Sequence, residues 1–125
     1  MTASTPENWR LTDDYLAATL VGHEPGLEQA VAAQHAAGMP AIEVAPLAGK
    51  LLMLLAQLSG AKRVLEIGTL GGYSTIWMAR GIPSDGHIVT LEAEPAHAVV
   101  ARANIDRAGV GEKVEILVGI AADSL

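Results

Sequence analysis

The stretch Val64-Leu65-Glu66-Ile67-Gly68-Thr69-Leu70-Gly71-Gly72-Tyr73-Ser74 decides the fold of this chain. Its first four residues predict a β-strand, and the glycines that follow predict a tight turn that leads into a helix. Glycine has no Cβ, so it tolerates positive φ and lets a ligand approach the backbone closely. The start of the helix presents N–H groups that no helical carbonyl accepts. The stretch therefore predicts a site for a nucleotide-like cofactor.

Two acidic residues narrow the kind of ligand. Glu66 lies two residues before the first glycine, where a pyrophosphate would prefer a neutral or positive cradle. A carboxylate at this point favours a ligand that carries a cationic or amino group. Glu92 ends the next predicted strand, about twenty residues past the glycines, where its carboxylate can accept hydrogen bonds from both hydroxyls of a ribose.

Short apolar runs alternate with helical patterns from Ala61 onward, which indicates βαβ units and a parallel sheet. The predicted strands cover residues 63–67, 87–92 and 114–118, and helices over 73–80 and 95–107 connect them. Right-handed crossovers place the strands in the spatial order 3-2-1, which is half of a doubly wound α/β sheet. The continuous apolar character of the strands predicts that both faces of the sheet are covered.

Three helices are predicted before the first strand. An N-cap at Thr12 begins the first, which ends at Gly22, and the next two cover residues 24–38 and 46–60. We expect these helices to form a cap packed against the sheet. The third carries a wide apolar stripe at helical spacing, formed by Leu47, Leu51, Leu54, Leu55 and Leu58.

Composition excludes several classes of protein. The chain has 125 residues, half of them apolar, which is enough for a modest core. A formal net charge of −6 with eight scattered basic residues argues against a nucleic-acid partner, which needs clustered Lys and Arg. The N-terminus lacks the apolar segment of a signal peptide, and the leucine-rich run 51–55 is too short to span a bilayer. We therefore expect a cytoplasmic protein without a membrane partner.

The sequence predicts neither a metal site nor a hydrolase nucleophile. It contains no cysteine, so disulfides and thiolate metal sites are excluded. Ser74 lacks the flanking glycines of a Gly-x-Ser-x-Gly elbow. No two of the four histidines share a helix face at ligand spacing; they are His23, His35, His87 and His97.

The pattern Glu66-x-Gly68-x-x-Gly71-x-Tyr73-Ser74 resembles motif I of S-adenosylmethionine-dependent O-methyltransferases, in particular the metal-dependent caffeoyl-CoA and catechol type. The likeness extends from about residue 41 to residue 125, and it includes Val44-Ala45-Pro46, Gly49-Lys50-Leu51-Leu52, Glu92 and Gly119-Ile120-Ala121. Members of that family are usually much longer. The resemblance thus implies one partial domain of the Rossmann-like fold over residues 1–125, with a helical cap at 1–60 and a βαβαβ cofactor-binding half at 61–125.

The resemblance also implies which residues bind S-adenosylmethionine. Glu92 would hold the ribose, and Gly68 and Thr69 would approach the methionine moiety through their backbone. Ser74 would bind the carboxylate end of that moiety, and Glu66 would lie near its amino group.

Two further contacts follow from the same resemblance. Ala121 would lie beside the adenine through its backbone, and Val44 would lie near the methionyl part. Ala45 stands where relatives often have a hydroxyl residue, so a side-chain contact is not expected there.

The same resemblance implies methyl transfer to a hydroxyl of a small aromatic acceptor. A divalent cation would lower the pKa of the acceptor, held by groups after a fourth and a fifth strand in a full-length parent. This sequence contains neither strand. We therefore expect the chain alone to bind no metal and to be inactive, and no catalytic residue is assigned.

A missing fourth strand would leave the backbone of residues 64–67 as an unpaired apolar edge. Such edges pair readily with other chains. We expect self-association through this strand, as a homodimer or by a swapped element, or else a piece of a longer parent.

Two other functions remain open at this point. A nicotinamide- or flavin-binding domain shares the βαβαβ layout, but its fingerprint is Gly-x-Gly-x-x-Gly and position 70 is a leucine here. A non-catalytic interaction module derived from a methyltransferase would keep the pocket and act through a partner.

Overall fold

The three predicted strands form one parallel sheet. The structure is a computed structural model that describes residues 4–125. Strand β1 (Arg63–Ile67) pairs with β2 (His87–Glu92), which pairs with β3 (Val114–Val118). The strand order β1-β2-β3 confirms the predicted spatial order, and the strand limits agree with the prediction at both ends.

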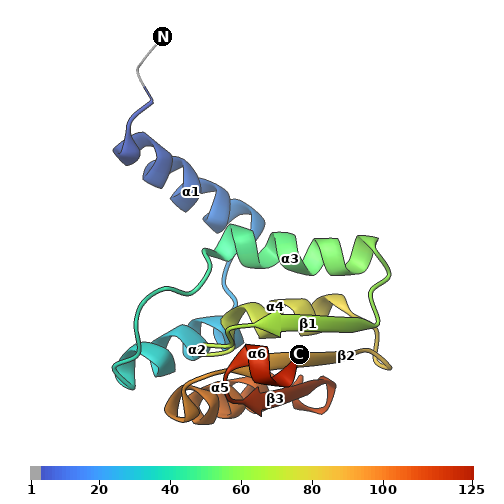
Figure 1. Cartoon of the computed structure of the whole chain (residues 1–125). Helices are drawn as coiled ribbons and strands as arrows, with labels where there is room; N and C mark the ends of the chain where they lie inside the picture. Colours follow the sequence, from blue (N-terminus) through green and yellow to red (C-terminus); the bar gives the residue numbers. More distant parts are fainter. Residues whose placement is uncertain (1–3) are drawn as a thin grey trace.

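Residues 4–125 also form six α-helices and one short 3₁₀ helix (Figure 1). Four of the α-helices begin with proline, whose fixed φ suits the first turn and whose missing N–H costs nothing there. The helices are α1 (Pro6–Leu20), α2 (Pro25–Ala36), α3 (Pro46–Leu58), α4 (Tyr73–Gly81), α5 (Pro95–Arg107), η1 (Gly111–Lys113) and α6 (Ala121–Ser124).

The N-cap of helix α1 is Thr5, seven residues before the predicted N-cap at Thr12. The hydroxyl of Thr5 accepts the backbone N–H of Asn8 at 3.3 Å and caps the helix, and Pro6 occupies its first turn. The hydroxyl of Thr12 instead donates to the carbonyl of Asn8 at 2.8 Å. Thr12 therefore forms an internal helical contact, and the cap predicted from its sequence context is wrong.

The core lies between the sheet and the helices α4 and α5. Ile76 on α4, Ile88 on β2 and Ile105 on α5 are wholly buried. Burying an aliphatic side chain of this size contributes about 1.5–3 kcal/mol. These residues fix α4 and α5 against one face of the sheet, so the loops that precede both helices lie at the carboxyl ends of the strands.

The opposite face of the sheet is open along β1 and β3 in the part of the chain that the structure describes, whereas Leu91 of the central strand is buried there. Exposure alternates along β1, and Leu65 and Ile67 are 55% and 62% exposed. The expectation that both faces are covered is thus wrong for residues 4–125. Apolar residues on both faces made the strands look doubly covered, whereas α4 and α5 pack on one face alone.

The N-terminal helices form a cap, but it packs mainly on other helices and not on the sheet. Helix α3 lies along α4, α2 contacts α5 and α4, and α1 contacts α3 and projects away from the sheet (Figure 1). Gly49 of α3 lies against the ring of Trp77 of α4, where an added Cβ would come within 2.3 Å of the ring. The leucines of α3 at positions 51, 54, 55 and 58 stay exposed.

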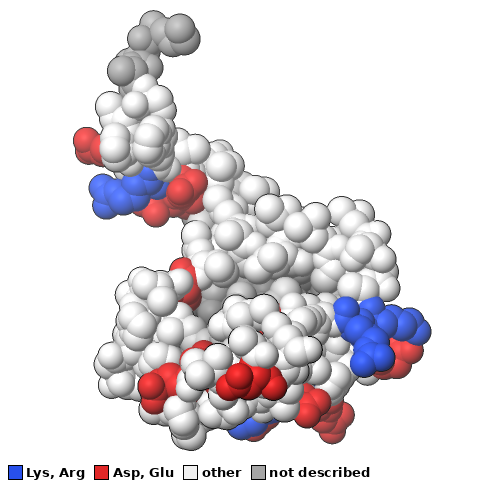
Figure 2. All heavy atoms as spheres, viewed as in Figure 1, with Lys and Arg blue, Asp and Glu red and all other residues white. Residues whose placement is uncertain are grey.

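Charged groups are sparse on the face of the molecule that Figure 2 shows. Figure 2 shows Lys and Arg atoms only in small groups next to Asp and Glu, and an uncharged expanse over α3. Within residues 4–125, no helix has both the length and the apolar character needed to cross a bilayer.

Candidate functional site

The loop between β1 and α4 has a backbone that few side chains tolerate. Gly68 and Gly72 have φ values of +90° and +84°, and Leu70 between them has a φ of +50°. The N–H of Gly68 donates to the carbonyl of Leu91 at 2.8 Å, so the loop leaves the sheet directly after β1. Gly72 precedes α4 without a side-chain cap. The loop therefore places the N-terminus of α4 at the carboxyl end of β1.

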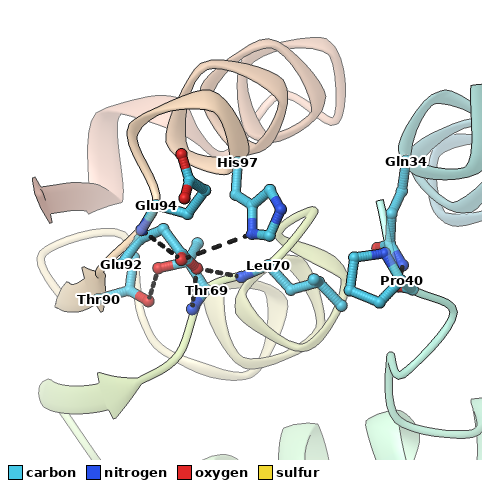
Figure 3. Close-up of polar contacts among 8 residues, drawn as sticks. All are labelled: Gln34, Pro40, Thr69, Leu70, Thr90, Glu92, Glu94 and His97. Carbon is cyan, nitrogen blue, oxygen red and sulfur yellow. Dashed lines mark hydrogen bonds and ion pairs between the residues drawn. The ribbon is translucent and has the colours of Figure 1, made fainter. Parts of the chain in front are cut away.

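The carboxylate of Glu92 accepts hydrogen bonds from the backbone of this loop (Figure 3). Its Oε2 atom accepts the backbone N–H groups of Thr69 at 3.1 Å and Leu70 at 2.7 Å, and its Oε1 atom accepts that of Glu94 at 3.0 Å. The Nδ1 atom of His97 lies 3.6 Å from the same Oε1 atom. A buried carboxylate needs such donors to offset its lost hydration. Glu92 is thus fixed in place at the end of β2 by the loop itself.

Glu66 is surrounded by hydroxyl groups. Its Oε1 atom accepts the hydroxyl of Ser74 at 2.5 Å, and its Oε2 atom accepts the hydroxyls of Thr75 at 2.5 Å and Thr90 at 2.6 Å. Ser74 and Thr75 belong to the first turn of α4, where the helix dipole favours a negative charge. Glu66 therefore connects β1, β2 and α4 through one carboxylate.

Thr69 connects the two acidic residues. Its N–H donates to Glu92, and its hydroxyl lies 2.6 Å from the hydroxyl of Thr90, which in turn donates to Glu66. The structure places the two carboxylates on one continuous hydrogen-bonded network around the glycine loop.

A cavity of about 100 Å³ lies directly above this loop. Four of the seven predicted site residues line it, namely Val44, Gly68, Thr69 and Ser74. Glu66 and Glu92 are not part of its lining and touch it only through Ser74 and Thr69. The full lining is Gln34, Ile42, Glu43, Val44, Gly68, Thr69, Leu70, Gly71, Tyr73 and Ser74.

Gly68 leaves open space where a side chain would be. A Cβ at this position would meet no atom within 4 Å, so the backbone of the loop is open to a ligand. Gly71 is different, because a Cβ there would lie 2.4 Å from Oε1 of Gln34. Gly68 therefore fits the approach of a cofactor, and Gly71 fits the close packing of α2.

Ala121 lies apart from the cavity in the described residues. It is the first residue of α6, two positions after Gly119, whose N–H donates to the carbonyl of Glu92 at 2.8 Å. This bond places the start of α6 at the same edge of the sheet as the glycine loop. No side-chain contact connects Ala121 to the other predicted site residues.

Sequence reasoning missed three polar residues around the loop. The amide of Gln34 donates to the carbonyl of Pro40 at 3.0 Å and to Glu43 at 2.7 Å, while its own Oε1 atom has no hydrogen-bond partner. His97 approaches Glu92 from α5. Gln34 had a signal, because it shares an apolar helix face with Leu27. Glu43 and His97 had none, since tertiary packing alone brings them to the site.

A larger cavity of about 380 Å³ lies between α1, α2 and the start of α3, and its lining is mostly apolar. Tyr73 lines both this cavity and the smaller one. Burial raises the pKa of Tyr73, and the nearby carboxylate of Glu43 adds to the increase. The phenol therefore stays protonated at neutral pH and separates the two cavities as a neutral group.

The described residues do not fit a metal ion. Residues 4–125 contain no group of three or more His, Asp or Glu side chains placed to share one. The carboxylate oxygens of Glu66 and Glu92 already accept hydrogen bonds from hydroxyl or N–H donors, and a cation would have to displace these donors. We therefore derive no chemistry through a metal from these residues.

Comparison with known proteins supplies the family. A family model described as O-methyltransferase matches residues 19–125. A catechol O-methyltransferase of Mycobacterium tuberculosis is 56% identical over 113 residues, which are 90% of this chain and 51% of that protein. The chain thus spans about half the length of the curated relatives that it matches.

Solved structures agree with the sequence relatives. The O-methyltransferase from Bacillus cereus in complex with SAH superposes with a TM-score of 0.93 at 49% identity, over 94% of this chain and 54% of that one. The O-methyltransferase TomG from Streptomyces achromogenes, in complex with SAM, gives a TM-score of 0.91 at 43% identity, over 97% and 54%. A glycine loop set between two acidic strand ends, the family match and these superpositions lead to one conclusion: the chain belongs to the O-methyltransferase family.

Proposed function

We propose that this chain binds S-adenosylmethionine at the carboxyl ends of β1 and β2, as the cofactor-binding portion of an O-methyltransferase. The observation that carries the proposal is the position of Glu66 and Glu92 on either side of one glycine loop, with Ser74 between Glu66 and the cavity. The SAH and SAM complexes of the structural neighbours support it.

The nucleoside end of the cofactor would bind next to Glu92. The carboxylate keeps acceptor capacity beyond its three backbone donors, and ribose hydroxyls are suitable donors for it. Ala121 would contact the adenine through its backbone, because Gly119 joins the start of α6 to β2. His97 would keep Glu92 oriented toward the sugar.

The amino-acid end would bind on the other side of the loop. Gly68 and Thr69 offer backbone in open space, and Val44 would cover the methionyl carbons from the loop before α3. The amino group would lie at Glu66 and the carboxylate at Ser74, near the N-terminus of α4. A carboxylate beside a hydroxyl at a helix start complements the two charges of an amino acid.

The activity of the whole protein would be transfer of the sulfonium methyl group to a hydroxyl of a small aromatic acceptor. The family relatives support a small-molecule acceptor, and the catechol relative suggests its class. The acceptor must lose a proton as the methyl group arrives, and residues 4–125 contain no assigned base. We therefore expect the 125-residue chain to bind the cofactor and to show no methyl transfer by itself.

A titration distinguishes this proposal from a nicotinamide-binding domain. Calorimetry with S-adenosylhomocysteine and with NAD should show binding of the first and no heat for the second. Tighter binding of NAD would overturn the assignment. A non-catalytic interaction module derived from a methyltransferase is the second candidate. Retention of cofactor binding without any transfer by the longest natural form of the protein would support that role.

The free edge of β1 supports a proposal about assembly. Strand β1 pairs on one side only within the described residues, and its exposed face is apolar. We propose that copies of this chain associate through β1, as a homodimer, when no further strand covers it. The division into a cap at 1–60 and a cofactor-binding half at 61–125, and a cytoplasmic location, stay predictions.

A further inference from the structure

Three buried threonine hydroxyls converge toward one carboxylate oxygen of Glu66. Thr75 and Thr90 are wholly buried, and Thr69 is 2% exposed. Thr75 and Thr90 donate to Oε2 at 2.5 and 2.6 Å, and Thr69 lies 2.6 Å from Thr90. They come from three separate elements: the glycine loop, α4 and β2. Two of the hydroxyls meet at Oε2, and the third reaches it through Thr90, an arrangement that local sequence preference does not produce.

The direction of these bonds follows from the number of protons. A threonine hydroxyl has one proton, and that of Thr90 is donated to Glu66. Thr69 must therefore donate to the oxygen of Thr90. All three protons are therefore directed along the network toward the carboxylate of Glu66.

The two oxygens of Glu66 consequently have different surroundings. Oε2 is occupied by buried donors from Thr75 and Thr90, whereas Oε1 meets only Ser74, which lines the cavity. Ser74 also has a single proton, and it can rotate to a different acceptor. A ligand ammonium group can thus replace the Ser74 proton at Oε1, and the Ser74 hydroxyl can turn to the ligand carboxylate.

We propose that Thr75 and Thr90 are positioning residues that hold Oε2 of Glu66, so that Oε1 and Ser74 together present a subsite for the amino-acid end of the ligand. This inference rests on the proposed binding of S-adenosylmethionine. Hydrogen bonds to a charged group are stronger than neutral ones. Their loss would let the carboxylate turn away from the cavity, and the amino-acid end would lose its partner while the nucleoside end would not.

The test compares two ligands in the 125-residue chain. S-adenosylhomocysteine carries the amino-acid end, and 5′-methylthioadenosine keeps the nucleoside and the sulfur but lacks that end. Calorimetry gives both dissociation constants for the wild type, Thr75→Val and Thr90→Val. Valine keeps the shape of threonine and removes the hydroxyl. Thr90→Ser restores the hydroxyl, and Thr19→Val is the matched control, because the exposed Thr19 hydroxyl donates to the Tyr15 carbonyl far from the site.

We expect Thr90→Val and Thr75→Val each to weaken the binding of S-adenosylhomocysteine about tenfold or more, because each removes one hydrogen bond to a charged group. Binding of 5′-methylthioadenosine should change less than about twofold, on the same scale. Thr90→Ser should restore most of the tighter binding of S-adenosylhomocysteine relative to 5′-methylthioadenosine. Thr19→Val should leave both dissociation constants unchanged. In a variant that already carries Glu66→Gln, adding Thr90→Val should no longer change the ratio of the dissociation constants for S-adenosylhomocysteine and 5′-methylthioadenosine, because the carboxylate that Thr90 supports is absent.

Several results would overturn the inference. Equal weakening of both ligands would mean that the threonines only stabilise the fold, and no weakening would mean that Glu66 needs no support. Melting curves identify a variant that does not fold. If Thr90→Val on β2 fails to fold, Thr75→Val on α4 provides the test, and the reverse holds as well. If the wild type binds neither ligand, the proposed function fails, and the inference fails with it. If the wild type binds S-adenosylhomocysteine and the ratio stays constant across the variants, only the inference fails.

Discussion

Oε2 of Glu92 accepts the backbone N–H of Leu70 at 2.7 Å, and Leu70 is the only non-glycine residue with a positive φ in the described part of the chain. A left-handed backbone costs a leucine about 1–2 kcal/mol. The charged hydrogen bond offsets this cost and holds the loop in its open form. Strain at a loop of this kind is typical of a ligand site.

The first prediction concerns Glu92 as an anchor of the loop. Glu92→Ala leaves three N–H groups without their acceptor, so we expect it to lower the free energy of unfolding by about 2–4 kcal/mol even without a ligand. Glu92→Gln keeps one acceptor oxygen and should cost about half as much. Urea denaturation measures both. Glu94→Ala is the control, because the exposed side chain of Glu94 holds none of these groups. Equal stability of Glu92→Ala and the wild type would contradict the anchor role.

The second prediction separates strain from ligand space. Gly68 and Gly109 both have a positive φ, and a Cβ at either position meets no atom within 4 Å. Gly68→Ala and Gly109→Ala should therefore each cost about 1–2 kcal/mol of stability through backbone strain. Only Gly68→Ala should also weaken the binding of S-adenosylhomocysteine, by more than about tenfold, because the methyl group of the new alanine would occupy space that the ligand needs. If both variants bind equally well, the ligand does not approach the loop.

The third prediction concerns the contact between α3 and α4. A Cβ at Gly49 would lie 2.3 Å from the ring of Trp77, which is nearly fully buried. Gly49→Ala should thus lower the free energy of unfolding by about 1–3 kcal/mol through overpacking. Trp77→Leu should remove the clash, so the two changes together should cost less than the sum of the single ones. Ala48→Ser on the exposed side of α3 should be close to neutral. Additive costs would contradict a direct clash.

The fourth prediction is a dependence of stability on alkaline pH. Burial raises the pKa of Tyr73 in the folded state, so the folded chain holds this proton more tightly than the unfolded chain. The resulting stability is complete below the unfolded pKa of about 10 and is lost as the pH rises through the folded pKa. Tyr73→Phe should therefore show a flatter decline of stability above about pH 10 than the wild type. Tyr15→Phe is the control, because Tyr15 is 70% exposed.

The fifth prediction concerns the free edge of β1. Gly68 donates to Leu91, and the carbonyl of Lys62 accepts from His87, so the even-numbered residues of this strand bond to β2. Alternate residues point the other way, and the N–H of Leu65 therefore faces the free edge. Leu65→Pro should remove an edge donor and reduce self-association, whereas Val64→Pro should break the β1–β2 ladder and unfold the chain. Light scattering over a range of concentrations measures the mass. A monomeric wild type would refute association through this edge.

The local pattern of the sequence was sufficient for the elements that form the sheet. The limits of β1, β2, β3 and α5 follow from apolar runs, from Pro95 and from the glycine turns, because strand and helix periods differ and proline and glycine mark the ends. The same pattern placed Glu66 and Glu92 at the carboxyl ends of neighbouring strands, since parallel strands carry their ends to one edge. The family followed from the glycine loop between them.

Other features depended on contacts between residues far apart in the chain. The helical period of the leucines predicts that they form an apolar face of α3. It does not predict that α3 packs on Trp77 through the different face that carries Gly49, which leaves those leucines exposed. Nor does it predict that one face of the sheet stays open along β1 and β3 within residues 4–125.

The tertiary structure also decided how the two acidic residues are used. Nothing in the spacing of Thr69, Thr75 and Thr90 predicts that their hydroxyls meet around Glu66, because they lie on three elements up to 24 residues apart from it. The sequence by itself determined the strand order and placed Glu66 and Glu92 at the ends of neighbouring strands. Packing alone determined which oxygen of Glu66 is held by the buried threonines and which by Ser74, because hydrogen-bond direction depends on the distance and angle between side chains that only the folded chain brings together.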